Sequence, residues 1–226
     1  IMIDFCTGFN GGNSDVLSRM FYGLLRRNCD LSNYQVHVVD NGVPIEMMGV
    51  GGFPPSAIKY KIKEGWHPTR GRYYTDSMVP QYEMHRWMVD NCGTCEWCVM
   101  CDFDMIIRRD VLAYMKERMS PDVGVIGSHG TDHNQLTPLF AVNRRAWRNR
   151  RIGFQAGPGK DGKQRDLGLL LAEDLEAQGF KWVKFELEPG MEPYYHHMGG
   201  GGGYHNKREF DAMRETALRI CEEQGL

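Results

Sequence analysis

Residues 97 to 107 carry the strongest pattern in the chain and read Trp97-Cys98-Val99-Met100-Cys101-Asp102-Phe103-Asp104-Met105-Ile106-Ile107. An apolar run of strand length leads into two aspartates one residue apart, and apolar residues then resume. Burying an ionised carboxylate is unfavourable unless it is paired or binds a metal. In extended chain the side chains at i and i+2 point the same way, so both carboxylates can share a hard cation through their oxygens. The alternative is a turn at the end of a strand with both aspartates solvated.

Predicted strands and helices alternate along the rest of the 226-residue chain. Apolar runs predict strands over residues 1–5, 36–39, 97–101, 123–126, 139–142 and 181–187. Helical spacing of apolar residues predicts helices over 14–25, 77–91, 110–119, 166–179 and 210–221, with Asp110 and Asp166 as N-caps. Residues 43–75 are expected to form a loop region with one short helix near Ile58. This alternation is typical of an α/β fold with a mostly parallel central sheet flanked by helices.

Composition and charge exclude several classes of protein. Hydrophobic residues make up 42% and charged residues 25%, which excludes a disordered chain. The net charge of −2 gives no global basic field for nucleic acid. The longest apolar runs fall short of the ~20 residues of a membrane-spanning helix, and no charged-then-apolar leader precedes Ile1. Seven cysteines, an odd and clustered set, do not fit a secreted disulfide scaffold, so we expect a cytoplasmic protein with reduced thiols.

Polar residues follow three of the predicted strands where those strands end. They are Thr7 to Asn10 after the first strand, Asp40-Asn41 after the second, and Asp102 to Asp104 after residues 97–101. In open α/β sheets ligands bind beyond the carboxyl ends of the strands. We therefore expect these three segments to form one binding edge.

These strand ends resemble those of the nucleotide-sugar glycosyltransferases of the GT-A fold, in particular their large inverting family. In that family the second strand ends in Val-Asp-Asp or Val-Asp-Asn before Gly, which matches Val39-Asp40-Asn41-Gly42. The fourth strand ends in Asp-x-Asp ahead of a helix start like Asp110-Val111-Leu112. The resemblance covers most of the chain, and these short motifs carry it.

The resemblance implies a set of site residues. The nucleotide sugar would be bound by Thr7, Phe9, Asp40, Asn41, Asp102 and Phe103, with Asp40 on the base, commonly uracil. Asp104, together with Asp102, would bind Mn²⁺ or Mg²⁺. In the family a carboxylate at the head of a later helix is the catalytic base, and Asp166 fits that place better than Glu173 or Asp174. The alternative for Asp166 is a plain N-cap.

Two adjacent histidines, His196 and His197, precede the five glycines of residues 199–203. Histidines beside a backbone that can approach a ligand closely suggest a contact with a metal or a pyrophosphate. In the resembled fold a C-terminal histidine often completes the metal shell, which implies His197 first and His196 second. The alternative is a pair of solvent-facing histidines before a flexible linker. We expect the glycine run to be a mobile lid that orders over the donor.

Four cysteines recur at every third position, namely Cys92, Cys95, Cys98 and Cys101. This spacing resembles iron–sulfur or zinc ligation. However, Cys98 and Cys101 lie in a predicted strand, where residues i and i+3 point to opposite faces. One cluster could not collect all four, and only Cys92 and Cys95 form a plausible ligand pair. We expect buried thiols, because free cysteine packs as a small hydrophobe.

Five arginines lie between residues 144 and 151, around Trp147. Arginines near an aromatic ring can bind phosphates and stack on bases. This pattern predicts acceptor binding by Trp147, Arg148 and Arg151, with an anionic acceptor such as DNA bearing a hydroxylated base, or else binding of the donor's diphosphate. The alternative is a solvated, charged helix face.

The patterns together predict a single domain. Residues 1–110 would form the nucleotide-binding half, 111–198 the acceptor half, and 199–226 the glycine run and a last helix. The expected activity is metal-dependent sugar transfer from a nucleotide-diphosphate donor, most simply a UDP-sugar, with inversion. One alternative is a nucleotidyltransferase, which also uses paired aspartates, although no basic glycine-rich phosphate loop follows the first strand. The other is a non-catalytic carbohydrate- or nucleic-acid-binding module.

Overall fold

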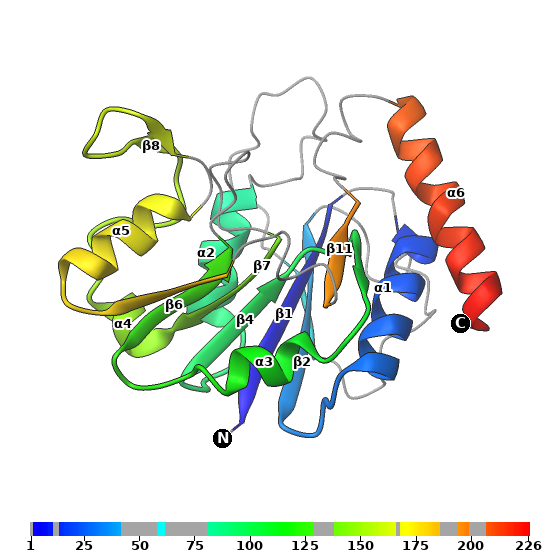
Figure 1. Ribbon diagram of the computed structural model, residues 1–226, viewed down its shortest axis with the longest axis horizontal. Coiled ribbons are helices and arrows are strands. Elements are labelled where there is room, and N and C mark those ends of the chain that lie inside the picture. The colour runs from blue at the N-terminus through cyan, green and yellow to red at the C-terminus, as the bar shows by residue number, and fades with distance from the viewer. Residues whose placement is uncertain are drawn as a thin grey trace.

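A seven-stranded sheet runs through the centre of the molecule (Figure 1). The computed structural model describes residues 2–10, 14–41, 58–61, 81–128, 138–165, 168–185, 194–198 and 207–226. The strand order is β10-β6-β7-β4-β1-β2-β3. The strands are β1 (Ile3–Asn10), β2 (Tyr34–Asn41), β3 (Ile58–Lys61), β4 (Trp97–Cys101), β6 (Val123–Ser128), β7 (Leu139–Asn143) and β10 (Lys181–Phe185). Of these seven, β7 is antiparallel to its neighbours and the other pairings are parallel, which confirms the mostly parallel α/β prediction.

Helices cover both faces of the sheet (Figure 1). One face packs against α1 (Ser14–Asn28), α3 (Val111–Lys116) and α6 (Lys207–Gln224), and we call this the α1-side core. The other packs against α2 (Gln81–Asn91), α4 (Arg144–Arg148) and α5 (Leu169–Ala177), which we call the α2-side core. Alternate residues of a strand point to opposite faces. Cys98 accordingly lies in the α2-side core and Cys101 in the α1-side core, as the sequence predicts.

Two short antiparallel ladders lie outside the central sheet. One pairs β5 (Met105–Ile107) with β11 (Tyr195–His197), and the other pairs β8 (Gly157–Pro158) with β9 (Gln164–Arg165). No helix in the described part of the chain combines the length and the apolar character that a bilayer crossing requires.

Two local predictions are wrong. Ile58–Lys61 is a strand paired with β2, not a helix, and its apolar and lysine residues alternate with the period of two that strands have. The N-cap of α5 is Gly168, with φ of +79°, and not Asp166. A left-handed residue at this point favours glycine, which has no Cβ to clash. Asp110 is confirmed as the N-cap of α3, since its Oδ1 accepts from the Ala113 amide at 2.8 Å. The predicted lid at 199–203 and the start of the helix at residue 77 lie outside the described residues.

A buried charged cluster closes the end of the sheet where β1 and β4 begin. The Asp4 side chain is 1% exposed. Its Oδ1 lies 2.8 Å from His37 Nε2, and its Oδ2 accepts from the Cys95 amide at 2.9 Å and from the Arg144 guanidinium. Gly93, with φ of +72°, passes so close to this carboxylate that a Cβ would not fit. The carboxylate therefore has charged and polar partners on both oxygens, as a buried charge requires.

Arg144 joins this cluster to the end of α2. Its Nε donates to the Val89 carbonyl at 2.9 Å, and its terminal nitrogens donate to the carbonyls of Cys92 and, at 2.6 Å, Cys95. The last carbonyls of a helix lack partners within the helix, and a cation there also complements the helix dipole. Arg144 thus ties β1, the end of α2 and the start of β4 together with one side chain.

Acid is expected to remove the stability that Asp4 supplies. Burial acts to raise the pKa of Asp4, but the hydrogen bonds with His37 and Arg144 outweigh it and hold the pKa below its ordinary value of 3.8. The unfolded chain therefore takes up this proton first as the pH falls. The stabilisation is complete above about pH 3.8 and is lost as the pH falls through the lower native pKa. Urea unfolding of the wild type and of Asp4→Asn at a series of pH values from below to above the ordinary pKa of 3.8 measures this loss. If the free energy of unfolding falls equally with pH in the two proteins, the expectation is contradicted.

Candidate metal site

Two aspartates lie where β4 leaves the sheet. β4 ends at Cys101, Asp102 follows, and β5 begins at Met105 after a tight turn. The Asp102 amide donates to the Pro138 carbonyl at 2.9 Å, which fixes the backbone at this point. In the parallel registers, Cys101 pairs with Thr7, and Phe9 pairs with Asp40. The three predicted strand ends therefore meet at one edge of the sheet.

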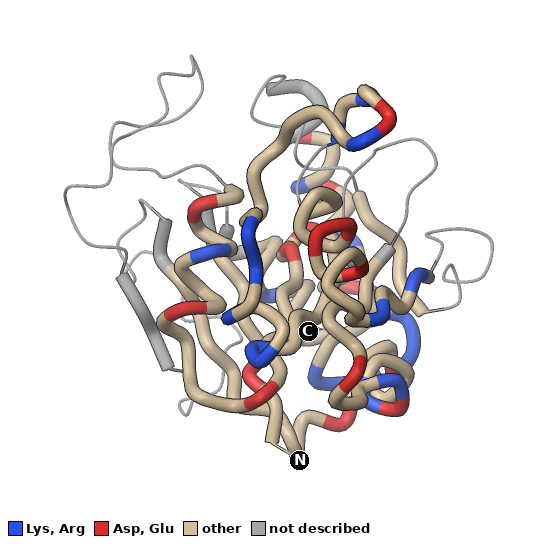
Figure 2. Tube along the Cα trace, turned by 90° about the vertical axis from the view of Figure 1, so that its left-hand side faces the viewer, with Lys and Arg blue, Asp and Glu red and all other residues tan. Residues whose placement is uncertain are grey.

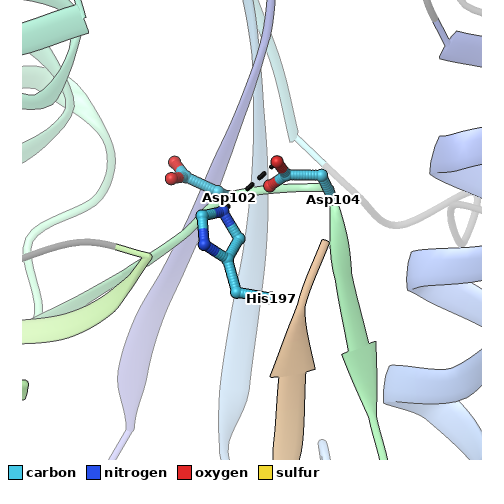
Figure 3. Close-up of side chains that lie close together, drawn as sticks. All are labelled: Asp102, Asp104 and His197. Carbon is cyan, nitrogen blue, oxygen red and sulfur yellow. Dashed lines mark ion pairs between the residues drawn. The ribbon is translucent and has the colours of Figure 1, made fainter. Parts of the chain in front are cut away.

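A histidine from far along the chain completes the group. β11 pairs antiparallel with β5, and His197 stands opposite Met105 in this ladder. The Met198 amide donates to the Asp104 carbonyl at 3.0 Å. These bonds bring His197 Nε2 to 3.2 Å from Asp104 Oδ2, and Figure 3 shows the imidazole directed at the two carboxylates. The neighbouring His196 is exposed and is not part of the group.

Asp102, Asp104 and His197 form a ligand set for a divalent cation. One ligand atom from each lies within 4.8 Å of the others. Within the described ranges this is the one group of three or more His, Cys, Asp or Glu side chains that meets the distance requirement. Carboxylate oxygens suit Mg²⁺ and Mn²⁺, and an imidazole nitrogen is tolerated better by Mn²⁺. The donor set therefore fits Mn²⁺ or Mg²⁺, and in an octahedral shell it leaves about half of the positions for other ligands.

The protonation of the group also favours a cation. Burial raises the pKa of Asp102 to about 7, and the charge of Asp104 adds to the rise, while His197 and Gln81 oppose it. Burial alone would lower the pKa of His197, but its hydrogen bond to Asp104 and the two nearby carboxylates raise it above the ordinary value. Like charges this close cannot both ionise easily without a positive partner. A divalent cation would supply that partner.

Two residues of α2 contact Asp102 and were not found from the sequence. Gln81 Nε2 lies 3.2 Å from Oδ1 and 3.4 Å from Oδ2 of Asp102. His85 Nε2 lies 3.9 Å from the same Oδ1. Burial lowers the pKa of His85 to about 3, so this ring is neutral at physiological pH. Their i, i+4 spacing places both on one helix face. That spacing was the available signal, but it does not say what the face contacts.

Some of the residues predicted to contact the nucleotide sugar lie at the sheet edge, and others are buried in the core. Phe9, Asp40 and Asn41 lie at the carboxyl ends of β1 and β2, at the same sheet edge as the metal group, and their side chains lie outside the described set. The Thr7 side chain is fully buried, and Phe103 is 8% exposed within the α1-side core. Both side chains thus belong to the interior in this structure, and their contact with a nucleotide sugar stays a prediction.

The proposed base, Asp166, lies outside the described residues. The two acidic residues that compete with it on α5 already have partners. Glu173 Oε1 accepts from Arg165 Nε at 2.6 Å. Asp174 is buried, and its Oδ2 accepts from the Arg151 amide at 2.7 Å and from Gln178 Nε2 at 3.0 Å. Both carboxylates thus connect α5 to neighbouring segments, Glu173 to Arg165 of β9 and Asp174 to the backbone at Arg151.

The arginine run does not form an aromatic docking surface. Trp147 is 2% exposed, its Nε1 donates to Asp90 Oδ1 at 2.6 Å, and its ring stacks on Phe154 with centroids 5.1 Å apart. The Arg150 guanidinium covers the indole at 3.5 Å. The ring is thus a core side chain and not the surface ring that the acceptor prediction assumed. Its sequence context, surrounded by charges, gave no sign of this burial.

The exposed arginines of the run lie far from the metal group. Gln81, the first residue of α2, contacts Asp102, whereas Asp90, near its end, contacts Trp147. These 11 residues span about 16 Å at ~1.5 Å per residue. Arg148 and Arg151 are exposed at the far end, so the structure does not bring them to the site as predicted. Figure 2 shows basic and acidic positions interspersed along the described trace.

No family model matches the sequence, and no curated protein matches it. Solved structures do match the fold. The mannosyltransferase PcManGT from Pyrobaculum calidifontis, solved with GDP-Man and Mn²⁺, matches with a TM-score of 0.54 and 15% identity, over 81% of this chain and 54% of that one. TarS from S. aureus matches with a TM-score of 0.57 and 11% identity, over 87% of this chain and 36% of that one. The chain thus spans only about half, or about a third, of these two proteins.

A third solved structure matches nearly end to end. A putative glucose-1-phosphate thymidylyltransferase from Bacillus anthracis, solved with a sucrose, has a TM-score of 0.53 and 10% identity, over 95% of this chain and 96% of that one. Identities this low establish the fold alone. The sheet order, the Asp-x-Asp turn after β4 and these likenesses together show that the chain has the GT-A fold.

Proposed function

We propose that the protein is a metal-dependent glycosyltransferase that uses a nucleoside-diphosphate sugar, with UDP as the nucleotide. The observation that carries the proposal is the group of Asp102, Asp104 and His197 at the carboxyl edge of β1, β2 and β4. Phe9 lies near the end of β1, and Asp40 and Asn41 are the last residues of β2, at the same edge of the sheet, where a nucleotide can lie. The solved mannosyltransferase PcManGT, bound to GDP-Man and Mn²⁺, supports a donor of this class.

In this proposal each residue has a defined task. Asp102, Asp104 and His197 would hold Mn²⁺ or Mg²⁺, which when bound offsets the negative charge that gathers on the departing diphosphate. Asp40 would accept hydrogen bonds from the base, and Asp166 would remove the proton of the acceptor hydroxyl. A single displacement opposite the leaving group inverts the anomeric centre. Proton NMR of the product's anomeric signal tests inversion, and a retained configuration would exclude it.

Thermal unfolding with nucleotide and metal tests the donor class. UDP and Mn²⁺ together are expected to raise the unfolding temperature well beyond either alone, because each completes the other's binding site. At a nucleotide concentration one hundred times the dissociation constant the stabilisation is about 2.7 kcal/mol. EDTA and the variant Asp104→Ala should both abolish it. GDP serves as the matched control for the base, and a larger shift with GDP than with UDP would refute the assignment of UDP.

A nucleotidyltransferase is the second candidate, and the end-to-end likeness to the thymidylyltransferase favours it. Such an enzyme also acts through a cation held by carboxylates. It would release pyrophosphate from a nucleoside triphosphate and a sugar 1-phosphate, whereas the glycosyltransferase would release UDP from a UDP-sugar. Assaying both products in parallel separates the two. A non-catalytic binding module would release neither and would bind its ligand equally well in EDTA.

A further inference from the structure

The two aspartates of the metal group are held in different ways. Asp104 is 5% exposed, its carbonyl accepts from the Met198 amide, and its side chain contacts His197. The antiparallel ladder of β5 and β11 therefore fixes Asp104, which directly precedes β5. Asp102 has no such bond to β11 among the contacts above, its side chain is 20% exposed, and its carboxylate contacts a different element, the first turn of α2.

The contact with α2 involves both oxygens of Asp102. Gln81 Nε2 lies 3.2 Å from one oxygen and 3.4 Å from the other, so a single amide nitrogen is nearly equidistant from both. An amide N–H donates and a carboxylate oxygen accepts. A carboxylate has about four lone pairs in all, so this contact still leaves Asp102 able to offer an oxygen to a cation.

We propose that Gln81 is a positioning residue that holds the Asp102 carboxylate in the orientation from which it binds the cation. The inference rests on the proposed function, because it assigns a partner to one ligand of the same site. A carboxylate already fixed in direction loses less rotational freedom when the cation binds, so the site binds more tightly. Mutating a residue that hydrogen-bonds to a metal ligand typically lowers metal affinity by about 10–100-fold.

Gln81 can act in this way because α2 is itself fixed. Met84 and Met88 are buried in the α2-side core, and Arg144 binds the carbonyls at the far end of the helix. His85, one turn after Gln81, packs edge-on against Phe140 with centroids 5.2 Å apart. The His85 ring lies 3.9 Å from Asp102 Oδ1 and restricts the rotation of the carboxylate on that side. A contact made from a helix packed in the core is more precise than one made from a loop.

Mn²⁺ binding to the metal-free protein, followed by electron paramagnetic resonance without any sugar donor, tests the inference. Gln81→Met keeps the length of the side chain and removes the donor, and its Mn²⁺ dissociation constant is expected to rise about tenfold or more. Gln81→Asn keeps an amide but withdraws it by one methylene, and it should share the loss. The matched control is Gln178→Met. In the wild type Gln178 Nε2 also donates to a buried aspartate, Asp174 of α5, at 3.0 Å, but this pair lies outside the metal group.

The outcomes separate this inference from the proposed function. Unfolding temperatures in EDTA show whether each variant is folded, and a merely structural role would lower that temperature while leaving Mn²⁺ affinity unchanged. Wild-type Mn²⁺ affinity in folded Gln81→Met and Gln81→Asn would overturn the inference, even if a donor is turned over. If Mn²⁺ binding requires Gln81 and Asp104 but no nucleotide sugar is hydrolysed, the inference stands and the proposed function fails.

Discussion

Replacing Asp104 with asparagine is expected to lower the Mn²⁺-dependent hydrolysis of the nucleotide-sugar donor about 10³-fold. Asp104 contributes the charge nearest to His197, with 3.2 Å between Oδ2 and Nε2, and it is almost fully buried. Asparagine has nearly the same shape but no charge, so the site loses half of its negative charge. A bound cation contributes several kcal/mol to the transition state, and ~1.4 kcal/mol changes the rate tenfold. Initial rates of UDP release at saturating Mn²⁺ measure the loss.

The same substitution at Asp122 is the control for Asp104→Asn. Asp122 is exposed and pairs with Lys181 at 2.6 Å, at the opposite end of the sheet from the metal group. Asp122→Asn should hydrolyse the donor at the wild-type rate. Comparable rates in Asp104→Asn and wild type, with both proteins folded, would show that Asp104 does not act in the reaction.

Replacing Arg144 with methionine is expected to lower the free energy of unfolding by about 3–5 kcal/mol. The substitution leaves the buried Asp4 carboxylate without its guanidinium partner, and it leaves the carbonyls of Val89, Cys92 and Cys95 without this donor. Removing one member of a buried ion pair costs much more than removing both, because the remaining charge stays buried. Urea unfolding at pH 7 measures the change.

Two further variants make the test of Arg144 specific. Arg148→Met changes an exposed arginine of the same helix, α4, and should leave the free energy of unfolding unchanged within error. Asp4→Leu combined with Arg144→Met removes both charges and should recover part of the stability lost in the single variant. If Arg148→Met and Arg144→Met are equally stable, the buried pair does not stabilise the fold.

Much of the fold and part of the site could be predicted from the sequence. The ends of the parallel strands follow from local patterns, because an apolar run that stops at polar residues marks both a strand and its carboxyl end. Thr7, Asp40 and Asp102 were placed at a common edge in this way, and the registers of β1 with β2 and β4 confirm it. His197 entered through a family resemblance, and the β5–β11 ladder gives it a structural position beside Asp104.

The misplaced residues share a physical cause. Whether a side chain is buried depends on which element packs over it, and neighbouring residues in the sequence do not encode that. Trp147 looked like a surface ring among arginines, yet α2 and Phe154 cover it. Gln81 looked like an ordinary helix residue, yet the direction of α2 places it against Asp102. Both outcomes depend on how α2 crosses the sheet face, which local periodicity leaves open.

The β5–β11 pairing has a consequence for the order in which the protein is made. All seven strands of the central sheet are encoded before residue 186, whereas His197 is translated later. Synthesis proceeds from the N-terminus, and a domain generally folds as a unit. The ribosome therefore delivers every strand of the sheet before the last ligand, and a nascent chain that ends at residue 185 holds both aspartates without the imidazole that completes their group.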